Sequence, residues 1–574
     1  MEDRPPKPES EATRGAAALA AWALGWAAAG AVLAVGLFAS SGHDDSYITF
    51  GSAYALRHTG SITNYNGERL EQSSALASTV LLALGDAVLP FLGLPAVGFL
   101  LSMAAAALCT ALATRLAERL SPGSGWAAAP LAATSTPLVY WAASGMETTL
   151  AATSQVAFAL AAGGFIASPS AARGALLALA AGLLATVRPE GPIVLGCVVA
   201  ALIAWAAWRR RGSDEARAVG AVAGVSAAVV LALVAWRSNA FGLWLPHPAV
   251  VKASGGARWS AGLSYLGQHL AWTPILGVGA LIGAEPQLQR ARATPTAHGV
   301  IAAAFLVADI AFVVRSGGDW MEFGRFLAPG LGIAAALLAA LVWDRAWPIR
   351  ARAAIVAIIA ASQIASTFYA TTVPSNSGRT LADALDVRDQ LERALGGTPV
   401  DLLDAGNAGH ARDVLLLAKL DPLLDQIRAR TNEPIVLFSG QAGMVPYYVF
   451  QRHENLVFID ACSLTTNRVN PLLNPKGLRA TSLGVRFPLT ALLAVEAKVK
   501  AETGLGRPDV IWDSGQKKPP ASAGYVVVYD AANHKRRVGW FGNHTIAGGY
   551  IAVREDWART LGLQAVPQTQ IPVD

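Results

Sequence analysis

Charged residues are scarce in this chain. Asp, Glu, Lys and Arg together make up only 15% of the 574 residues, whereas 53% are hydrophobic and the mean hydropathy is +0.41. So low a charge content excludes an ordinary soluble enzyme and is typical of a polytopic membrane protein. The net charge of +6 therefore indicates loop lysines and arginines that face anionic lipid. No DNA- or RNA-binding motif occurs, so we expect no nucleic-acid partner.

Cysteine is also rare, and nucleotide-binding motifs are absent. The three cysteines, Cys109, Cys197 and Cys462, are widely spaced, which predicts neither a disulfide framework nor a zinc site. The sequence contains no Gly-rich P-loop and no dinucleotide fingerprint. A sugar donor that carries a nucleotide would need a phosphate-binding loop of this kind, so the absence disfavours a nucleotide-sugar enzyme.

Long apolar runs are what the chain has in abundance. Residues 16–39 carry no charge, and crossing a bilayer takes roughly 20 apolar residues. This run is too long for the core of a signal peptide, so we expect a retained first helix. The other runs that we expect to cross the membrane are residues 96–114, 126–142, 149–166, 173–187, 191–208, 216–236, 263–283, 297–314, 325–343 and 351–371.

Basic clusters orient these spans. The clusters within residues 209–211, 290–292 and 345–352 belong in the cytoplasm under the positive-inside rule. Counting outward from them, the polar loops near residues 44–50, 144–148, 188–191, 245–253 and 317–326 lie on the opposite side. The count is consistent only if the apolar residues 74–90 do not cross, so we predict a re-entrant or surface-lying segment there. About eleven spans remain.

The chain changes character after about residue 372. Residues 434–439 and 525–529 read as buried strands, whereas residues 381–395 have helical spacing and many charges. We therefore predict two domains, a transmembrane catalytic domain at 1–371 and a soluble α+β domain at 372–574 that lies outside the cytoplasm.

Two adjacent aspartates, Asp44 and Asp45, follow the first apolar run. A pair of carboxylates beside apolar membrane favours a chemical role, and the alternative is a charged signal that ends the helix. Tyr47, Phe50 and Tyr54 follow at helical spacing. A helix there would present an aromatic stripe either to the membrane interface or to a protein core.

Carboxylates and cations are thus expected on one outer face. Transfer of a sugar from a lipid phosphate needs a base for the acceptor hydroxyl, cations for the leaving phosphate and an apolar path for the lipid. Asp44 or Asp45 is suited to accept the proton, and Arg188, Lys252 and Arg325 are suited to hold the phosphate.

Six segments carry a family resemblance. They are Asp-Asp-Ser-Tyr-Ile-Thr at 44–49, Ser-Gly-Met-Glu-Thr at 144–148, Arg-Pro-Glu-Gly at 188–191, Leu-Pro at 245–246 with Lys-Ala at 252–253, Gly-Gly-Asp-Trp-Met at 317–321 with Gly-Arg-Phe at 324–326, and Val-Pro-Tyr-Tyr at 445–448. In this order they resemble bacterial GT-C fold glycosyltransferases. Among these, the chain is most similar to the terminal arabinofuranosyltransferases of mycobacterial cell-wall arabinan.

The resemblance implies a multi-pass enzyme of the plasma membrane. It would take a sugar, arabinofuranose first, from a polyprenyl phosphate such as decaprenyl phosphate. It would add that sugar, on the outer side, to a cell-envelope glycan, the arabinan of arabinogalactan or lipoarabinomannan. The base of the GT-C pattern maps to Asp44 or Asp45. We favour Asp44, with Asp45 orienting substrate or binding a divalent cation; no cofactor is certain.

The remaining substrate-binding residues are also implied by the resemblance. They are Glu147, Arg188, Glu190, His247, Lys252, Asp319 and Arg325. His247 departs from the pattern, because an amide side chain is more usual at that position. Structural alternatives stay open for several of them: Glu147 as a helix cap, Arg188 with Glu190 as a local ion pair, and Lys252 as a side chain that reaches to lipid headgroups.

Aromatic residues of the C-terminal part suggest binding of the acceptor. Trp512, Trp540 and Tyr550 have flat rings of the kind that stack on sugar faces. Packing in a core is the alternative for each.

Two other functions stay open. One is a GT-C transferase that moves another sugar to a different glycan, lipid or protein. The other is a lipid-linked sugar transporter, which would be expected to show internal repeats or broken helices with polar residues near the middle of the membrane. The sequence shows neither feature.

Overall fold

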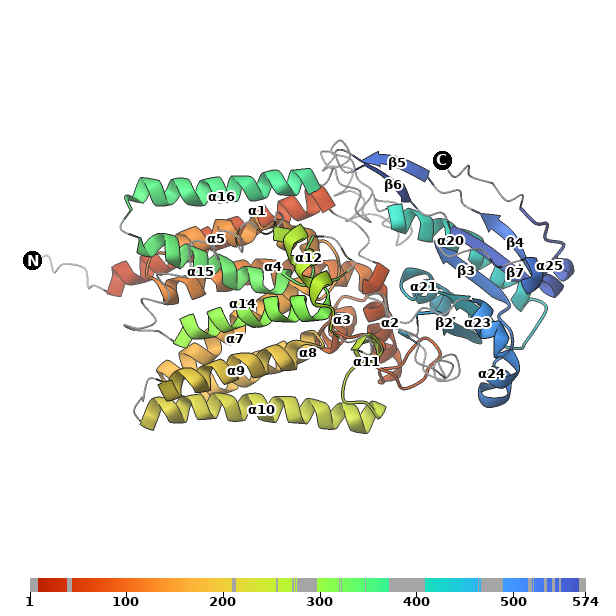
Figure 1. Cartoon of the computed structure of the whole chain (residues 1–574), viewed down its shortest axis with the longest axis horizontal. Coiled ribbons are helices and arrows are strands. Elements are labelled where there is room, and N and C mark those ends of the chain that lie inside the picture. Colours follow the sequence, from red (N-terminus) through yellow and green to blue (C-terminus); the bar gives the residue numbers. More distant parts are fainter. Residues whose placement is uncertain are drawn as a thin grey trace, which may run out of the picture.

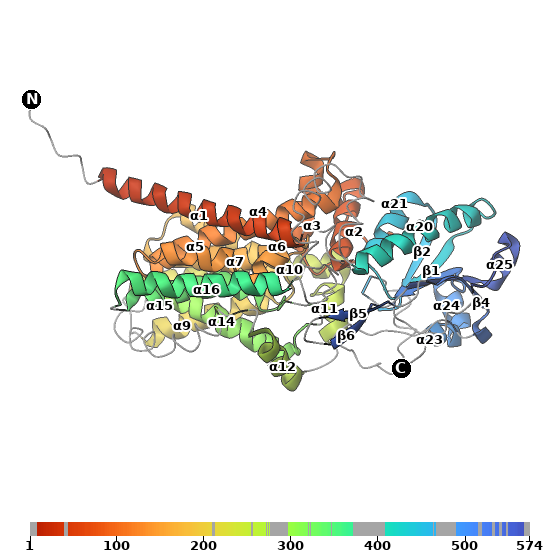
Figure 2. The same cartoon turned by 90° about the horizontal axis from the view of Figure 1, so that it is seen from above.

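The computed structural model consists of a long helical bundle and a sheet-containing C-terminal part beyond one end of it (Figure 1). It describes residues 9–38, 44–208, 213–253, 257–270, 273, 275, 297–319, 321, 323–345, 347–370, 408–462, 464–465, 489–514, 519, 521–530, 534–538, 542–546 and 549–566. Figure 2 shows the same two parts from above, with helices α2 and α3 between them.

The bundle confirms a polytopic membrane protein. Among the described residues, seven helices are long and apolar enough to cross a membrane. They are α1 (Glu9–Phe38), α4 (Gly93–Leu120), α7 (Thr148–Ala167), α9 (Gly191–Trp208), α10 (Ser213–Phe241), α14 (Ala297–Ser316) and α16 (Ile349–Ala370). Shorter apolar helices, α8 (Ala171–Val187) and α15 (Leu331–Asp344), run beside them.

The run at 126–142 is not one helix but two, α5 (Gly125–Ala133) and α6 (Thr136–Ala142). Pro137 stands in the first turn of α6, where proline is tolerated because it needs no N–H partner, whereas it disfavours a helix before it. The run at 263–283 lies mostly outside the described residues, so the total of about eleven spans stays a prediction.

Helix α3 (Leu76–Val88) covers the segment that we predicted not to cross. Its 13 residues reach about 20 Å at 1.5 Å per residue, less than the roughly 30 Å of the hydrocarbon core. It packs against α2 (Asp44–Thr59) and α4 at the end of the bundle next to the C-terminal part. This placement agrees with a re-entrant or surface-lying segment.

The basic ends of several helices gather at the opposite end of the bundle. Helix α4 ends beside α15, where the Ser121 hydroxyl donates to the Asp344 carboxylate at 2.6 Å. Arg119 stands in the last turn of α4, and Arg345 and Arg352 flank the junction of α15 and α16. These arginines therefore share the end that lies far from the C-terminal part (Figure 1).

The C-terminal part is built around a five-stranded mixed sheet with the strand order β2-β1-β3-β7-β4. Strands β1 (Ile435–Ser439), β2 (Leu456–Asp460) and β3 (Val510–Ser514) are parallel, and β7 (Gly549–Arg554) and β4 (Tyr525–Asp530) continue the sheet antiparallel. Both predicted strands are confirmed as β1 and β4. The predicted helix at 381–395 lies outside the described residues.

Helices cover this sheet, and a hairpin stands apart from it. The helices are α20 (Ala408–Arg428), α21 (Met444–Arg452), α23 (Leu489–Ala494), α24 (Glu496–Thr503) and α25 (Glu555–Leu561), with a short 3-10 turn η3 (Ala521–Ala523). The hairpin pairs β5 (His534–Val538) with β6 (Gly542–Ile546). The predicted domain boundary near 372 falls between the end of α16 and the start of α20, outside the described residues.

Helix α2 joins the two parts. Tyr47 and Phe50 have no exposed surface, and the ring of Tyr47 lies 5.3 Å from the ring of Tyr447 on α21. Of the two alternatives for the aromatic stripe, the structure shows packing in a core. The core is shared: α2, α3 and α4 contribute residues to the same cluster as α20, α21 and the sheet.

A buried ion pair ties the connection between α2 and α3 to the bundle. Glu71 receives two hydrogen bonds of 2.8 Å from the Arg237 guanidinium on α10, and both side chains are about 97% buried. The Glu71 carbonyl also accepts from the backbone N–H of His247, at the start of α11 (His247–Ala253). The pair therefore connects three segments that are remote in the sequence.

Replacing Glu71 with Ala is expected to destabilise the protein strongly. Arg237 would remain buried without a counter-charge, and breaking such a pair costs about 3–5 kcal/mol. The measurement is thermal unfolding of the full chain in detergent micelles. The double variant Glu71→Gln/Arg237→Met is the control and is expected to recover most of the loss. A single variant as stable as the wild type would contradict the expectation.

Candidate active site

Glu147 stands at the centre of a buried charge cluster, at the end of the helical bundle that lies next to the C-terminal part. It follows a turn that Gly145 permits with a φ of +71°. The Ser144 hydroxyl donates to the Trp141 carbonyl at 2.7 Å and accepts from the Met146 N–H at 3.1 Å, which closes the turn. Glu147 occupies the N-cap position of α7, but its side chain makes no capping hydrogen bond. Capping alone does not account for this residue.

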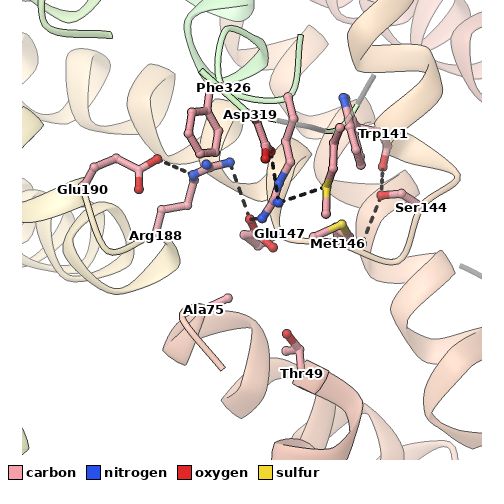
Figure 3. A network of polar contacts seen from close by, with 12 residues as sticks. Thr49, Ala75, Trp141, Ser144, Met146, Glu147, Arg188, Glu190, Asp319 and Phe326 are labelled. Atoms are coloured by element: carbon pink, nitrogen blue, oxygen red, sulfur yellow. Dashed lines mark hydrogen bonds and ion pairs between the residues drawn. The ribbon is translucent and has the colours of Figure 1, made fainter. Parts of the chain in front are cut away.

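Arg188, at the C-terminal end of α8, lies between two carboxylates (Figure 3). Its Nε donates to Glu190, and its Nη1 lies 3.5 Å from Glu147 Oε1. The ring of Phe326 lies 4.9 Å from the guanidinium carbon. The predicted local pair with Glu190 is therefore present, but it is one part of a larger network.

Arg325 completes the network from the loop between α14 and α15. Its Nη2 donates to Glu147 at 3.0 Å, and its Nη1 lies 3.3 Å from Asp319 and 3.0 Å from the Met321 sulfur. The loop depends on glycine: Gly318 has a φ of +78°, and a Cβ there would lie 2.3 Å from the ring of Tyr265 on α12 (Trp259–His269). The predicted Glu147, Arg188, Glu190, Asp319 and Arg325 thus meet in one place.

The cluster keeps its charges. Burial by itself would raise the pKa of Glu147, but Arg325 and Arg188 hold it below the usual range. Burial would lower the pKa of Arg325, but Glu147, Asp319 and Asp45 raise it above its ordinary value. Both shifts favour the ionised forms at neutral pH.

Two guanidinium donors in the cluster have no hydrogen-bond acceptor among the described residues. They are Arg188 Nη1 and Arg325 Nε, both shielded from solvent; Arg188 Nη1 is ion-paired with Glu147 at 3.5 Å but makes no hydrogen bond to a described residue. A buried donor without an acceptor costs about 1–3 kcal/mol, and guanidinium groups match the oxygens of phosphate and carboxylate. The arrangement is therefore suited to receive an oxyanion such as phosphate.

The two aspartates at the start of α2 have different surroundings. Asp44 Oδ1 accepts a 2.8 Å hydrogen bond from the backbone N–H of Met444, so its carboxylate is engaged with the C-terminal part. The charge of Asp45 instead acts on Arg325. Adjacent helical residues point about 100° apart, which explains the division. The preference for Asp44 as the base is not supported by this placement, and Asp45 is the aspartate whose charge contributes to the raised pKa of Arg325.

Two further predicted residues lie on α11. His247 is 6% exposed, and its backbone N–H donates to the Glu71 carbonyl. Lys252 is exposed. Neither takes part in the ion pairs that join Glu147, Arg188 and Arg325.

The predicted acceptor-binding aromatics are corrected in part. Trp512 has no exposed surface and stacks on Phe458 at 5.5 Å between ring centroids. Tyr550 is 5% exposed and belongs to a hydrophobic core that includes residues of β1, β3 and β4. Both side chains stabilise the sheet from its core, so neither ring is free to stack on a sugar. Trp540 lies outside the described residues.

A buried acid beside the cluster was missed by the sequence analysis. Asp309, on the apolar helix α14, accepts a 2.9 Å hydrogen bond from the Gln155 amide. It lies close enough to Glu190 and Arg188 for their charges to act on its carboxyl group. An acid inside an apolar span is itself a functional signal, and this one was available in the sequence. Tyr265, whose hydroxyl accepts from the Phe326 N–H at 3.3 Å, lies in no recognisable motif.

A metal site is not evident in the described part of the chain. No three His, Cys, Asp or Glu residues gather there in a way that could hold an ion. The carboxylates of Glu147, Glu190 and Asp319 each face an arginine instead. A divalent cation at Asp45 stays a prediction.

The chain is similar in structure to membrane glycosyltransferases. ArnT from Cupriavidus metallidurans in the apo state has a TM-score of 0.53 and 14% identity, with 97% of this chain and 100% of that one covered. ArnT from the same organism bound to undecaprenyl phosphate has a TM-score of 0.52 and 14% identity, with 94% of this chain and 98% of that one covered. A third similar structure is the archaeal oligosaccharyltransferase AglB from Archaeoglobus fulgidus in complex with an inhibitory peptide and a dolichol-phosphate. Its TM-score is 0.53 at 12% identity, with 86% of this chain and 69% of that one covered.

No protein-family model matches the chain, and no curated protein matches it. At 12–14% identity the structural likeness speaks for the fold. A bundle of membrane helices followed by a sheet-containing part, superposable over nearly the whole chain on ArnT, is the GT-C fold.

Proposed function

We propose that the protein is a glycosyltransferase that takes a sugar from a polyprenyl phosphate at the Glu147–Arg188–Arg325 cluster. The observation that carries the proposal is the pair of buried guanidinium nitrogens that make no hydrogen bond to any residue the structure describes, Arg188 Nη1 and Arg325 Nε. The oxygens of a phosphate group would supply a hydrogen-bond acceptor to each of these two nitrogens. Proteins of the same fold bind lipid phosphates, undecaprenyl phosphate in ArnT and dolichol-phosphate in AglB.

Each part of the cluster has a role in this reaction. The two arginines stabilise the phosphate as negative charge develops on it when the bond to the sugar breaks. Glu147 bridges both arginines and keeps the guanidinium groups in register. Asp45 is the proposed base. In this role it accepts the proton of the acceptor hydroxyl as the new glycosidic bond forms. The polyprenyl chain lies along the apolar helices.

The side of the membrane follows from charge. Arg119, Arg345 and Arg352 lie at the end of the bundle far from the cluster. The positive-inside rule assigns that end to the cytoplasm. The cluster and the C-terminal part then face the outer side of the plasma membrane, where a lipid-linked donor replaces a soluble nucleotide sugar.

The proposed sugar is arabinofuranose and the proposed acceptor is the arabinan of a cell-envelope glycan. The support is the series of six sequence segments from Asp44 to Tyr448. The structure brings residues of three of these segments, Glu147, Arg188 and Arg325, into direct contact.

The test is sugar transfer by the purified full-length protein in lipid nanodiscs. Polyprenyl-phosphoryl-arabinofuranose and an arabinan-like oligosaccharide are the substrates, and the matched mannose donor is the control. Transfer of arabinose alone is expected. Transfer from the mannose donor alone would keep the transferase and overturn the sugar. No transfer from either donor, with binding of both demonstrated, would overturn the enzyme and leave transport of a lipid-linked sugar.

A further inference from the structure

The start of α2 meets the start of α21, which comes from the other part of the chain. Asp44 Oδ1 accepts the backbone N–H of Met444, the first residue of α21, at 2.8 Å. The first N–H groups of a helix have no acceptor within the helix, and negative charge is favoured there. Asp44 therefore caps a helix that lies 400 residues away in the sequence.

Gly443 is shaped for this contact. A Cβ at this position would lie 2.3 Å from Asp44 Oδ1 and 2.2 Å from the Asp44 carbonyl oxygen. Both distances are far below van der Waals contact, and one of the two atoms belongs to the backbone. Any side chain at 443 would push the start of α2 away from α21.

Tyr65 reinforces the same junction. Its hydroxyl donates to the Ala442 carbonyl at 3.0 Å, and the carbonyls of Gly443 and Tyr47 lie at 3.3 Å. Burial, and after it the negative charge of Asp44, raises the pKa of this hydroxyl, so the hydroxyl remains a donor at neutral pH. It joins α2 to the segment that immediately precedes α21.

Asparagines of the following loop hold the edge of the sheet. The Asn66 amide donates to the Phe458 carbonyl at 2.9 Å and accepts from the Phe458 N–H at 2.7 Å, so it pairs with strand β2 as a neighbouring strand would. Asn64 donates to the Thr465 carbonyl at 2.9 Å. The loop after α2 is thus attached to the C-terminal part by hydrogen bonds between its asparagine side chains and the backbone of that part.

We propose that Asp44 is a positioning residue rather than the base. The C-terminal part holds the first turn of α2 through Asp44 and thereby directs the next residue, Asp45, toward Arg325. This assignment deepens the proposed function and rests on it. The C-terminal part is then required for the transfer step itself, not only for recognition of the acceptor.

The test separates the oxygen acceptor of Asp44 from its charge. Asp44→Asn keeps a side-chain oxygen at the same place, and asparagine is as good a helix cap as aspartate. Sugar transfer by this variant is expected to stay within about 3-fold of the wild type. Asp44→Ala removes the acceptor and Gly443→Ala displaces it, so both are expected to lower kcat by at least about 10-fold with the donor KM unchanged.

Hydrogen exchange of the full-length variants provides a readout that does not depend on catalysis. Peptides that cover residues 444–448 are expected to exchange faster in Asp44→Ala and Gly443→Ala, and at the wild-type rate in Asp44→Asn. If transfer is never detected, this measurement still tests the contact. The proposal is overturned if Asp44→Asn loses transfer while its exchange is unchanged, or if Asp44→Ala exchanges and transfers as the wild type does.

Discussion

Replacing Asp45 with Asn is expected to reduce sugar transfer by about 100-fold or more, since a positioned general base contributes 10²–10⁴ to such a rate. An amide of the same size cannot accept the proton of the acceptor hydroxyl. Asp45 is the proposed base because its charge contributes to the raised pKa of Arg325, whereas Asp44 accepts a hydrogen bond from the backbone of Met444. The measurement is the transfer rate at saturating donor and acceptor, with donor binding measured separately.

The matched control is the neighbouring substitution, Asp44→Asn. It removes the same charge from the same turn of α2 but keeps the oxygen that accepts from Met444. Unchanged donor binding in Asp45→Asn would show that the cluster itself is intact. If Asp45→Asn transfers sugar within a few-fold of the wild type, the proton goes to another group and the role proposed for Asp45 is wrong.

Replacing Glu147 with Gln is expected to destabilise the protein strongly and to abolish donor binding. Glu147 is 6% exposed and bridges Arg188 and Arg325. With a neutral amide between them, two buried guanidinium groups would repel each other and share only Glu190 and Asp319. Breaking a buried pair costs about 3–5 kcal/mol, so we expect a large fall in Tm and the loss of donor binding.

The pH dependence of stability gives this prediction a second readout. The pKa of Glu147 is lower in the folded protein than its ordinary value. Its contribution is therefore complete above the ordinary carboxyl range and is lost as the pH falls through the folded pKa. The Gln variant should lack this part of the acid destabilisation.

The control is Asp214→Asn, an exposed acid in the first turn of α10 whose side chain pairs with Arg217 at the surface. It should leave Tm unchanged, because exposed pairs contribute little. Thermal unfolding of the three proteins, first at pH 7 and then at falling pH, makes the comparison. Equal stability of Glu147→Gln and the wild type at every pH would show that the carboxylate does not hold the arginines.

Much of the fold was predictable because its signals are local. An apolar run such as 191–208 crosses the membrane for reasons of hydropathy and length, and the structure has α9 there (Gly191–Trp208). Strands β1 and β4 were readable from short β-branched runs between turn residues. The break between α5 and α6 was not predicted, although the polar residues Thr134, Ser135 and Thr136, followed by a proline, interrupt the apolar run there.

The candidate site was predictable as a set of residues but not as an arrangement. Glu147, Arg188 and Arg325 were named from motifs, yet nothing in their spacing says that one carboxylate bridges both arginines. Trp512 and Tyr550 were assigned to sugar binding by residue type alone. Their burial depends on which face of the sheet is covered, and that is set by segments distant in the sequence.

The sequence by itself determined that this is a membrane protein with a sheet-containing C-terminal part and a polar face made of a few charged segments. These properties follow from composition and from local hydropathy. Only the tertiary structure decided which of two adjacent aspartates is held by the C-terminal part. Asp44 and Asp45 are chemically identical, and what separates them is the turn of one helix and the N-terminus of α21, a partner 400 residues away.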